Sequence, residues 1–134
     1  MSLSAILLLA NALWDLLSAA AILIRTHLLP NHCLYLADAH LALWADEADR
    51  QNLAASATMA FLLLQWAIVR LRGAAAGPVS DAACVDAAAS YVVEAAMVAF
   101  EVAAGRMHAL GGWAVVVLSF VCWAIVVREC VEGV

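Results

Sequence analysis

The sequence predicts an all-α integral membrane protein, a single membrane domain of residues 1–134 built as a four-transmembrane-helix bundle. Two observations indicate this fold class. Hydrophobic residues make up 68% of the chain, well above the roughly 45–50% of soluble domains. These residues also gather in four runs, each long enough to cross a bilayer. A soluble domain of this size cannot bury so much apolar surface, so lipid is expected to cover it.

The expected spans are separated by short turns, except after the first. The first span covers residues 3–24, and at about 1.5 Å per residue it crosses a hydrocarbon core of roughly 30 Å. The second covers 53–70, the third 82–105 and the fourth 110–128. Arginines close the first, second and fourth runs. The third is rich in alanine, which suits close helix packing.

The segment between the first two spans, residues 31–50, has a different composition. Leu41 and Trp44 fall at near-helical spacing among acidic residues. This pattern predicts an amphipathic helix that lies in the membrane interface. Asp46 is the expected N-cap residue.

Repeated motifs suggest that the spans form two duplicated helical hairpins. Residues 66–69, with the sequence Trp-Ala-Ile-Val, recur as residues 123–126 near the ends of the second and fourth spans. An Arg-x-His motif follows both the first and the third span. Asp15 and Glu94 occupy matching places within those two spans. The alternative is chance, because Ala, Val and Ile are abundant in this chain.

Charge and motifs exclude several classes of function. The net charge is -5, and all six basic residues are arginines, so neither a nucleic-acid partner nor a polybasic lipid-binding segment is expected. The arginines are divided evenly between the two sides, which leaves the orientation open. The four cysteines form no CxxC pair, and catalytic or nucleotide-binding motifs are absent from the sequence, so we expect a protein that is not an enzyme.

Polar side chains inside the spans are the candidates for a functional site. Asn11 and Asp15 are four residues apart and share one helix face, while Glu94 and Glu101 are seven apart and share another. Gln65 lies in the second span. A charge at the bilayer centre costs at least about 2.5 kcal/mol, so these five residues are expected to face the bundle interior.

Asp15 and Glu94 are expected at the same depth, near the membrane midplane. Every arginine lies near an expected span end, so no basic partner is predicted for these acids and both are expected to be protonated. Glu101, nearer one surface, is expected to pair with Arg25. Two interpretations stay open: the acids form interhelical hydrogen bonds only, or they form a proton or cation site.

Histidines and one tryptophan are candidate contacts for a cofactor or a partner. His27, His40, His108 and Trp44 are all expected at one membrane face. The sequence has no HxxxH or HExxH motif, so no metal site is expected. Lipid is the expected bound molecule, and chlorophyll or carotenoid would join it in a photosynthetic complex. The alternative is that these side chains contact lipid headgroups or loops.

Two functions are compatible with these patterns. The first is a small non-enzymatic subunit that packs with other membrane subunits and lipids in a larger complex, photosynthetic or respiratory, in a thylakoid or inner mitochondrial membrane. The alternative is a small proton- or cation-coupled transporter that acts as a homodimer through buried carboxylates. In size, in its four spans and in the acid of the first span, Asp15, the chain resembles the small multidrug transporters. Those proteins lack the long amphipathic segment, and the resemblance implies architecture alone.

Overall fold

The computed structural model describes residues 2–76 and 81–132, and these are helical apart from short links and one isolated β-bridge. The four long helices are α1 (Leu3–Leu23), α4 (Leu53–Ala76), α5 (Asp81–Ala103) and α6 (Ala109–Glu132). A π-helical turn, η1 (Ile24–Leu28), continues α1. Each of the four helices is long and apolar enough to cross a membrane, which confirms the predicted all-helical architecture with four candidate spans.

The end of α4 differs from the prediction. The second span was expected to end at residue 70, but α4 continues to Ala76. Residues 71–76 are good helix formers apart from Gly73, and Gly73 lies where a β-carbon would be too close to Ala87 of α5, so the helix continues past the end of the apolar run. Arg70 therefore lies well inside α4. The interior of the bundle therefore contains a positive charge that the sequence analysis did not expect.

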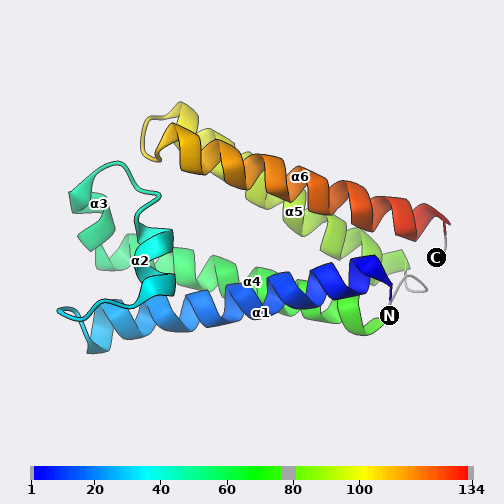
Figure 1. The fold of residues 1–134 in the computed structure, drawn as a ribbon, viewed down its shortest axis with the longest axis horizontal. Coiled ribbons are helices and arrows are strands. Elements are labelled where there is room, and N and C mark those ends of the chain that lie inside the picture. Colours follow the sequence, from blue (N-terminus) through cyan, green and yellow to red (C-terminus); the bar gives the residue numbers. More distant parts are fainter. Residues whose placement is uncertain (1, 77–80, 133–134) are drawn as a thin grey trace.

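The four long helices form two antiparallel hairpins, α1 with α4 and α5 with α6 (Figure 1). The hairpins lie close together at the end that carries both chain termini, which we call the narrow end. They diverge toward the opposite end, which we call the wide end. Consecutive long helices are thus hairpin partners, which is the arrangement that a duplication requires. The common origin of the two hairpins stays a prediction.

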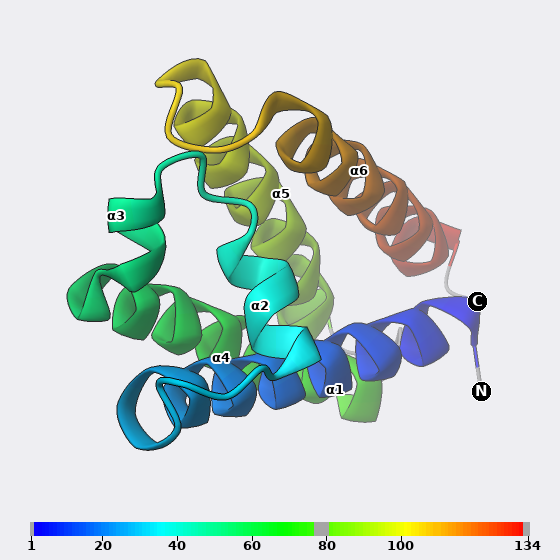
Figure 2. The same cartoon turned by 60° about the vertical axis from the view of Figure 1, so that its left-hand side comes forward.

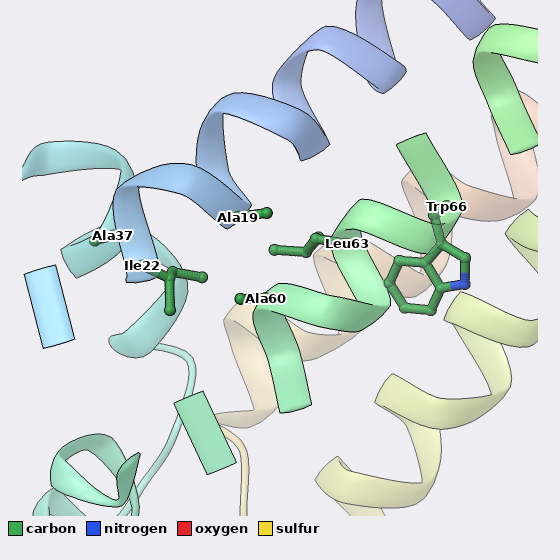
Figure 3. Packing of buried hydrophobic residues seen from close by; sticks show 6 residues of the cluster. All are labelled: Ala19, Ile22, Ala37, Ala60, Leu63 and Trp66. Carbon is green, nitrogen blue, oxygen red and sulfur yellow. The ribbon is translucent and has the colours of Figure 1, made fainter. Parts of the chain in front are cut away.

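Small side chains let α1 and α4 pack closely along their length. Ala19 and Ile22 of α1 lie against Ala60 and Leu63 of α4, and all four are buried (Figure 3). Small residues at such contacts bring the two backbones near to each other, which favours association of apolar helices.

Three contacts hold α5 and α6 in place. A disulfide joins Cys84 of α5 to Cys130 of α6. Gly112 of α6 lies so close to Val102 of α5 that any β-carbon at position 112 would overlap the valine side chain. At the narrow end, Glu129 of α6 accepts a hydrogen bond of 2.9 Å from the backbone N–H of Ser4 at the start of α1. This last contact satisfies one of the free N–H groups that begin every helix.

The segment between α1 and α4 forms two short helices instead of the one predicted. These are α2 (Tyr35–Leu41) and α3 (Glu47–Gln51), and both lie at the wide end between the hairpins (Figure 2). Asp46 caps α3 as expected, because its side chain accepts from the N–H of Ala48 at 2.9 Å.

The link between α2 and α3 crosses to the turn between α5 and α6. Trp44 pairs with Met107 in an isolated antiparallel bridge. Two backbone hydrogen bonds of 2.8 Å flank the pair, from Ala45 to Arg106 and from His108 to Leu43. The bridge therefore ties the first hairpin to the second where they are furthest apart.

Candidate functional site

A buried arginine between two carboxylates forms the centre of the candidate site. The side chain of Arg70 is 2% exposed, and its Nη1 lies 2.6 Å from Oδ2 of Asp15. Its Nη2 forms a second salt bridge with Oε2 of Glu94, and its Nε donates to Ser90 Oγ at 3.2 Å. Three helices meet in this cluster, α1 through Asp15, α4 through Arg70, and α5 through Glu94 and Ser90. We call these four residues the Arg70 cluster.

Aromatic rings enclose the guanidinium of Arg70. Its central carbon lies 4.1 Å from the ring centroid of Tyr91 and 5.7 Å from that of Trp66. Both distances are within the range of cation–π attraction. Asn11 holds the tyrosine in place, because its side-chain amide donates to Tyr91 Oη at 2.8 Å. Side chains of α1, α4 and α5 thus hold the guanidinium in place.

The charges of the cluster do not balance. Two carboxylates face one guanidinium, so the fully ionised cluster carries one surplus negative charge. An unpaired charge in an apolar interior is strongly disfavoured, and it is relieved when a proton or a cation binds. The two acids differ in access: the Asp15 side chain is 5% exposed and that of Glu94 is 15% exposed. Glu94 is therefore the acid better placed to exchange its partner.

A cavity of about 400 Å³ leads from the Arg70 cluster toward the wide end of the bundle. Arg70, Asp15 and Glu94 all line it. The cavity is thus large enough to hold several water molecules or a small ligand. Further lining side chains that bear polar groups or aromatic rings include Asn11, Trp14, His40, Trp44, Tyr91 and Ser119.

The outer part of the cavity is bordered by α2 and by exposed apolar residues. Trp14 of α1 and Leu118 of α6 both line the cavity, yet 48% and 64% of their surfaces are exposed. The ring of His40 lies 5.9 Å from that of Trp14, between centroids. Trp44 also lines the cavity, and its Nε1 is buried without a hydrogen-bond partner among the described residues.

The structure corrects two of the sequence-based pairings. Arg70 is the basic partner that was not expected for Asp15 and Glu94. Glu101 pairs with Arg106, at 2.5 and 2.9 Å, instead of with Arg25. Arg25 lies 3.4 Å from Asp38 of α2. Arg106 reaches Glu101 because it lies five residues later, just after the end of α5. Arg25 reaches Asp38 because the link between η1 and α2 turns the chain back beside it.

The remaining predicted site residues divide into two groups. Glu101, His40 and Trp44 line the same cavity as Asn11, Asp15 and Glu94. Gln65, His27 and His108 do not line it, and all three are exposed. Gln65, which was expected inside the bundle, instead lies on the outer face of α4.

Sequence reasoning missed Arg70, Ser90 and Tyr91. A signal for Arg70 was present: Leu63, Trp66 and Arg70 follow at helical spacing on the buried face of α4. Among the described residues, no group of three or more His, Cys, Asp or Glu side chains is arranged to hold a metal ion.

Comparison with known proteins leaves the site to be interpreted from its own geometry. No protein-family model, no curated protein sequence and no solved structure matches this chain. The site combines a buried arginine, two carboxylates and two aromatic rings at one end of a cavity.

Proposed function

We propose that this chain is a four-span membrane protein that binds a proton or a small monovalent cation at the Arg70 cluster and carries it across the membrane. The observation that supports this proposal is the surplus carboxylate at the inner end of a cavity. In this proposal Asp15 holds Arg70 in place. Glu94 exchanges between the arginine and the transported ion.

A purely structural role for the cluster accounts for less of its geometry. A single acid would neutralise Arg70, and a second buried acid adds a further desolvation cost. Ionisable groups inside membrane spans are rare for this reason and commonly line ion or proton pathways. The cavity beside Glu94 gives an ion or water a place to approach the cluster. A cluster that only held helices together would need no such space.

Competition at one carboxylate offers a simple coupling mechanism. Arg70 already donates to Glu94, so an entering cation must displace the guanidinium from that acid. The displaced guanidinium keeps its contacts with Asp15 and Ser90. A proton and a cation neutralise the same surplus charge, so binding of one lowers the affinity for the other.

Flux measurements in lipid vesicles test this function. Purified protein is reconstituted with a pH-sensitive dye inside, and a sodium or potassium gradient is applied. The wild type should move protons in the direction opposite to the cation flux, and Glu94→Gln should abolish this exchange. Glu132→Gln is the matched control, because Glu132 is half-exposed and, among the described residues, forms a salt bridge only with Arg128. Exchange that persists in Glu94→Gln, or a wild type that carries none, would contradict the proposal.

A role as a non-enzymatic subunit of a larger membrane complex is the second candidate. The exposed amide of Gln65 on the outer face of α4 favours it, because a polar group there is better satisfied by another protein than by lipid. Purification in mild detergent separates the two candidates. A stable complex with other subunits would support the second, and bound pigments would extend it to a photosynthetic assembly.

A further inference from the structure

The outer face of α4 carries a polar side chain at mid-length. Gln65 is exposed and lies twelve residues after Leu53, where the 24-residue helix begins. It is therefore about 18 Å along the helix, near the midplane if α4 spans a bilayer. No hydrogen bond joins its side chain to any residue that the structure describes.

An amide at that depth needs a polar partner. Hydrocarbon offers no hydrogen bonds, and lipid headgroups lie too far away. Outward-facing side chains at similar positions on the other described helices are apolar, such as Leu17, Val93 and Val117. No residue of its own chain that the structure describes supplies this partner, which favours a partner from another polypeptide.

The surroundings of Gln65 favour a second copy of the same chain. A carboxamide both donates and accepts, so two glutamines across a two-fold axis satisfy each other with a reciprocal pair of hydrogen bonds. Phe61 and Ile68, which are 62% and 52% exposed, flank Gln65 on the same face. They supply apolar contact on either side of the amide pair.

We propose that the chain forms a parallel dimer in which Gln65, Phe61 and Ile68 of α4 contact the same residues of a second copy. The Cys84–Cys130 disulfide requires that the end of the bundle that carries it faces an oxidising compartment. Every copy then has the same orientation in the membrane, so two copies pair in parallel. Arg70 lies on the opposite, buried face of α4. Each copy therefore keeps a complete Arg70 cluster, and the dimer does not depend on the proposed ion transport.

Energy transfer between labelled copies tests the dimer in lipid vesicles. Cys33 is a free, exposed thiol and takes the donor or acceptor dye, while Cys122→Ser removes the other free thiol. Transfer should rise with the protein-to-lipid ratio. Gln65→Leu should weaken the dimerisation constant roughly tenfold, since two interhelical hydrogen bonds are lost. Gln65→Asn keeps the amide and should retain most of the affinity.

Cysteine crosslinking identifies the face that pairs. Ile68→Cys should crosslink between copies on oxidation, whereas Val117→Cys on the outer face of α6 should not. Because Gln65 has no hydrogen-bond partner among the described residues of its own chain, Gln65→Leu should leave the Cys84–Cys130 disulfide and the fold intact. A monomer at every protein density, equal dimerisation of Gln65→Leu and wild type, or crosslinking through position 117 alone would each overturn the proposal. So would a different protein that copurifies with the wild type and is lost from Gln65→Leu.

Discussion

Replacement of Arg70 by methionine should strongly destabilise the bundle. Arg70 is 2% exposed and is the partner of both Asp15 and Glu94, so its loss leaves two buried acids without a counter-charge. Removing one partner of a buried ion pair typically costs about 3–5 kcal/mol. The upper part of that range is expected here, because two acids lose the same cation. Native stabilities are only about 5–15 kcal/mol, so much of the folded population should be lost.

A triple variant isolates the electrostatic part of this loss. Asp15→Asn and Glu94→Gln, combined with Arg70→Met, remove all three charges but keep similar side-chain volumes. Neutral replacements of buried charges are often tolerated, so the triple variant should recover most of the free energy of unfolding. Arg106→Met is the exposed control, because 47% of that side chain is exposed, and the change should cost about 0–1 kcal/mol.

Unfolding in mixed micelles with a rising fraction of dodecyl sulfate measures these differences. Helical circular dichroism reports the folded fraction. The loss caused by Arg70→Met should shrink as the pH falls, because protonated acids need no counter-charge. A loss below about 1 kcal/mol at neutral pH, or a triple variant no more stable than the single one, would refute the account of the Arg70 cluster.

Three further predictions concern cysteines and a close helix contact. The hydrogen bond from Cys33 to Asp38, together with the charge of that carboxylate, raises the pKa of the thiol. Less thiolate is then present at a given pH, so alkylation of Cys33 should be slow, and Asp38→Asn should accelerate it; an unchanged rate would contradict the contact. Impermeant thiol reagents should label Cys33 from one side of the membrane and Cys130 only from the other, after reduction of its bond to Cys84; labelling of both from one side would exclude the four-span topology. Gly112→Ala should destabilise the protein by about 1–3 kcal/mol, because its methyl group overlaps an α5 side chain; unchanged thermal stability would show that α5 and α6 are further apart.

The helical architecture could be predicted because an apolar run long enough to cross a bilayer satisfies its own backbone hydrogen bonds when it forms a helix. The same signal misplaced the end of α4, since an apolar run ends at its first charge and a helix does not. Whether Arg70 lies at a surface or in the interior depends on which acids the neighbouring helices bring to it. Asp15 and Glu94 are distant in sequence, so this convergence is a tertiary property.

The level of a polar residue along its helix could be predicted more reliably than the side of the helix on which it lies. Spacing along each helix placed Asp15 and Glu94 at one level, and the structure brings both to Arg70 at that level. Spacing did not show which way Gln65 faces, because its helix is apolar on most sides and its outer face differs little in hydrophobicity from its inner one. The Cys84–Cys130 disulfide was missed for a related reason, since it depends on the rotation of α5 against α6.

Infrared spectroscopy of the buried carboxyl groups tests the central claim most directly. The surplus charge of the Arg70 cluster predicts that, without a bound cation, the wild type at neutral pH holds a protonated carboxyl whose band disappears in Glu94→Gln. Saturation with the transported cation should remove the same band and release one proton per chain. Fully ionised carboxylates in the absence of any cation, with no change when a cation is added, would contradict the claim that this cluster binds a proton or a cation.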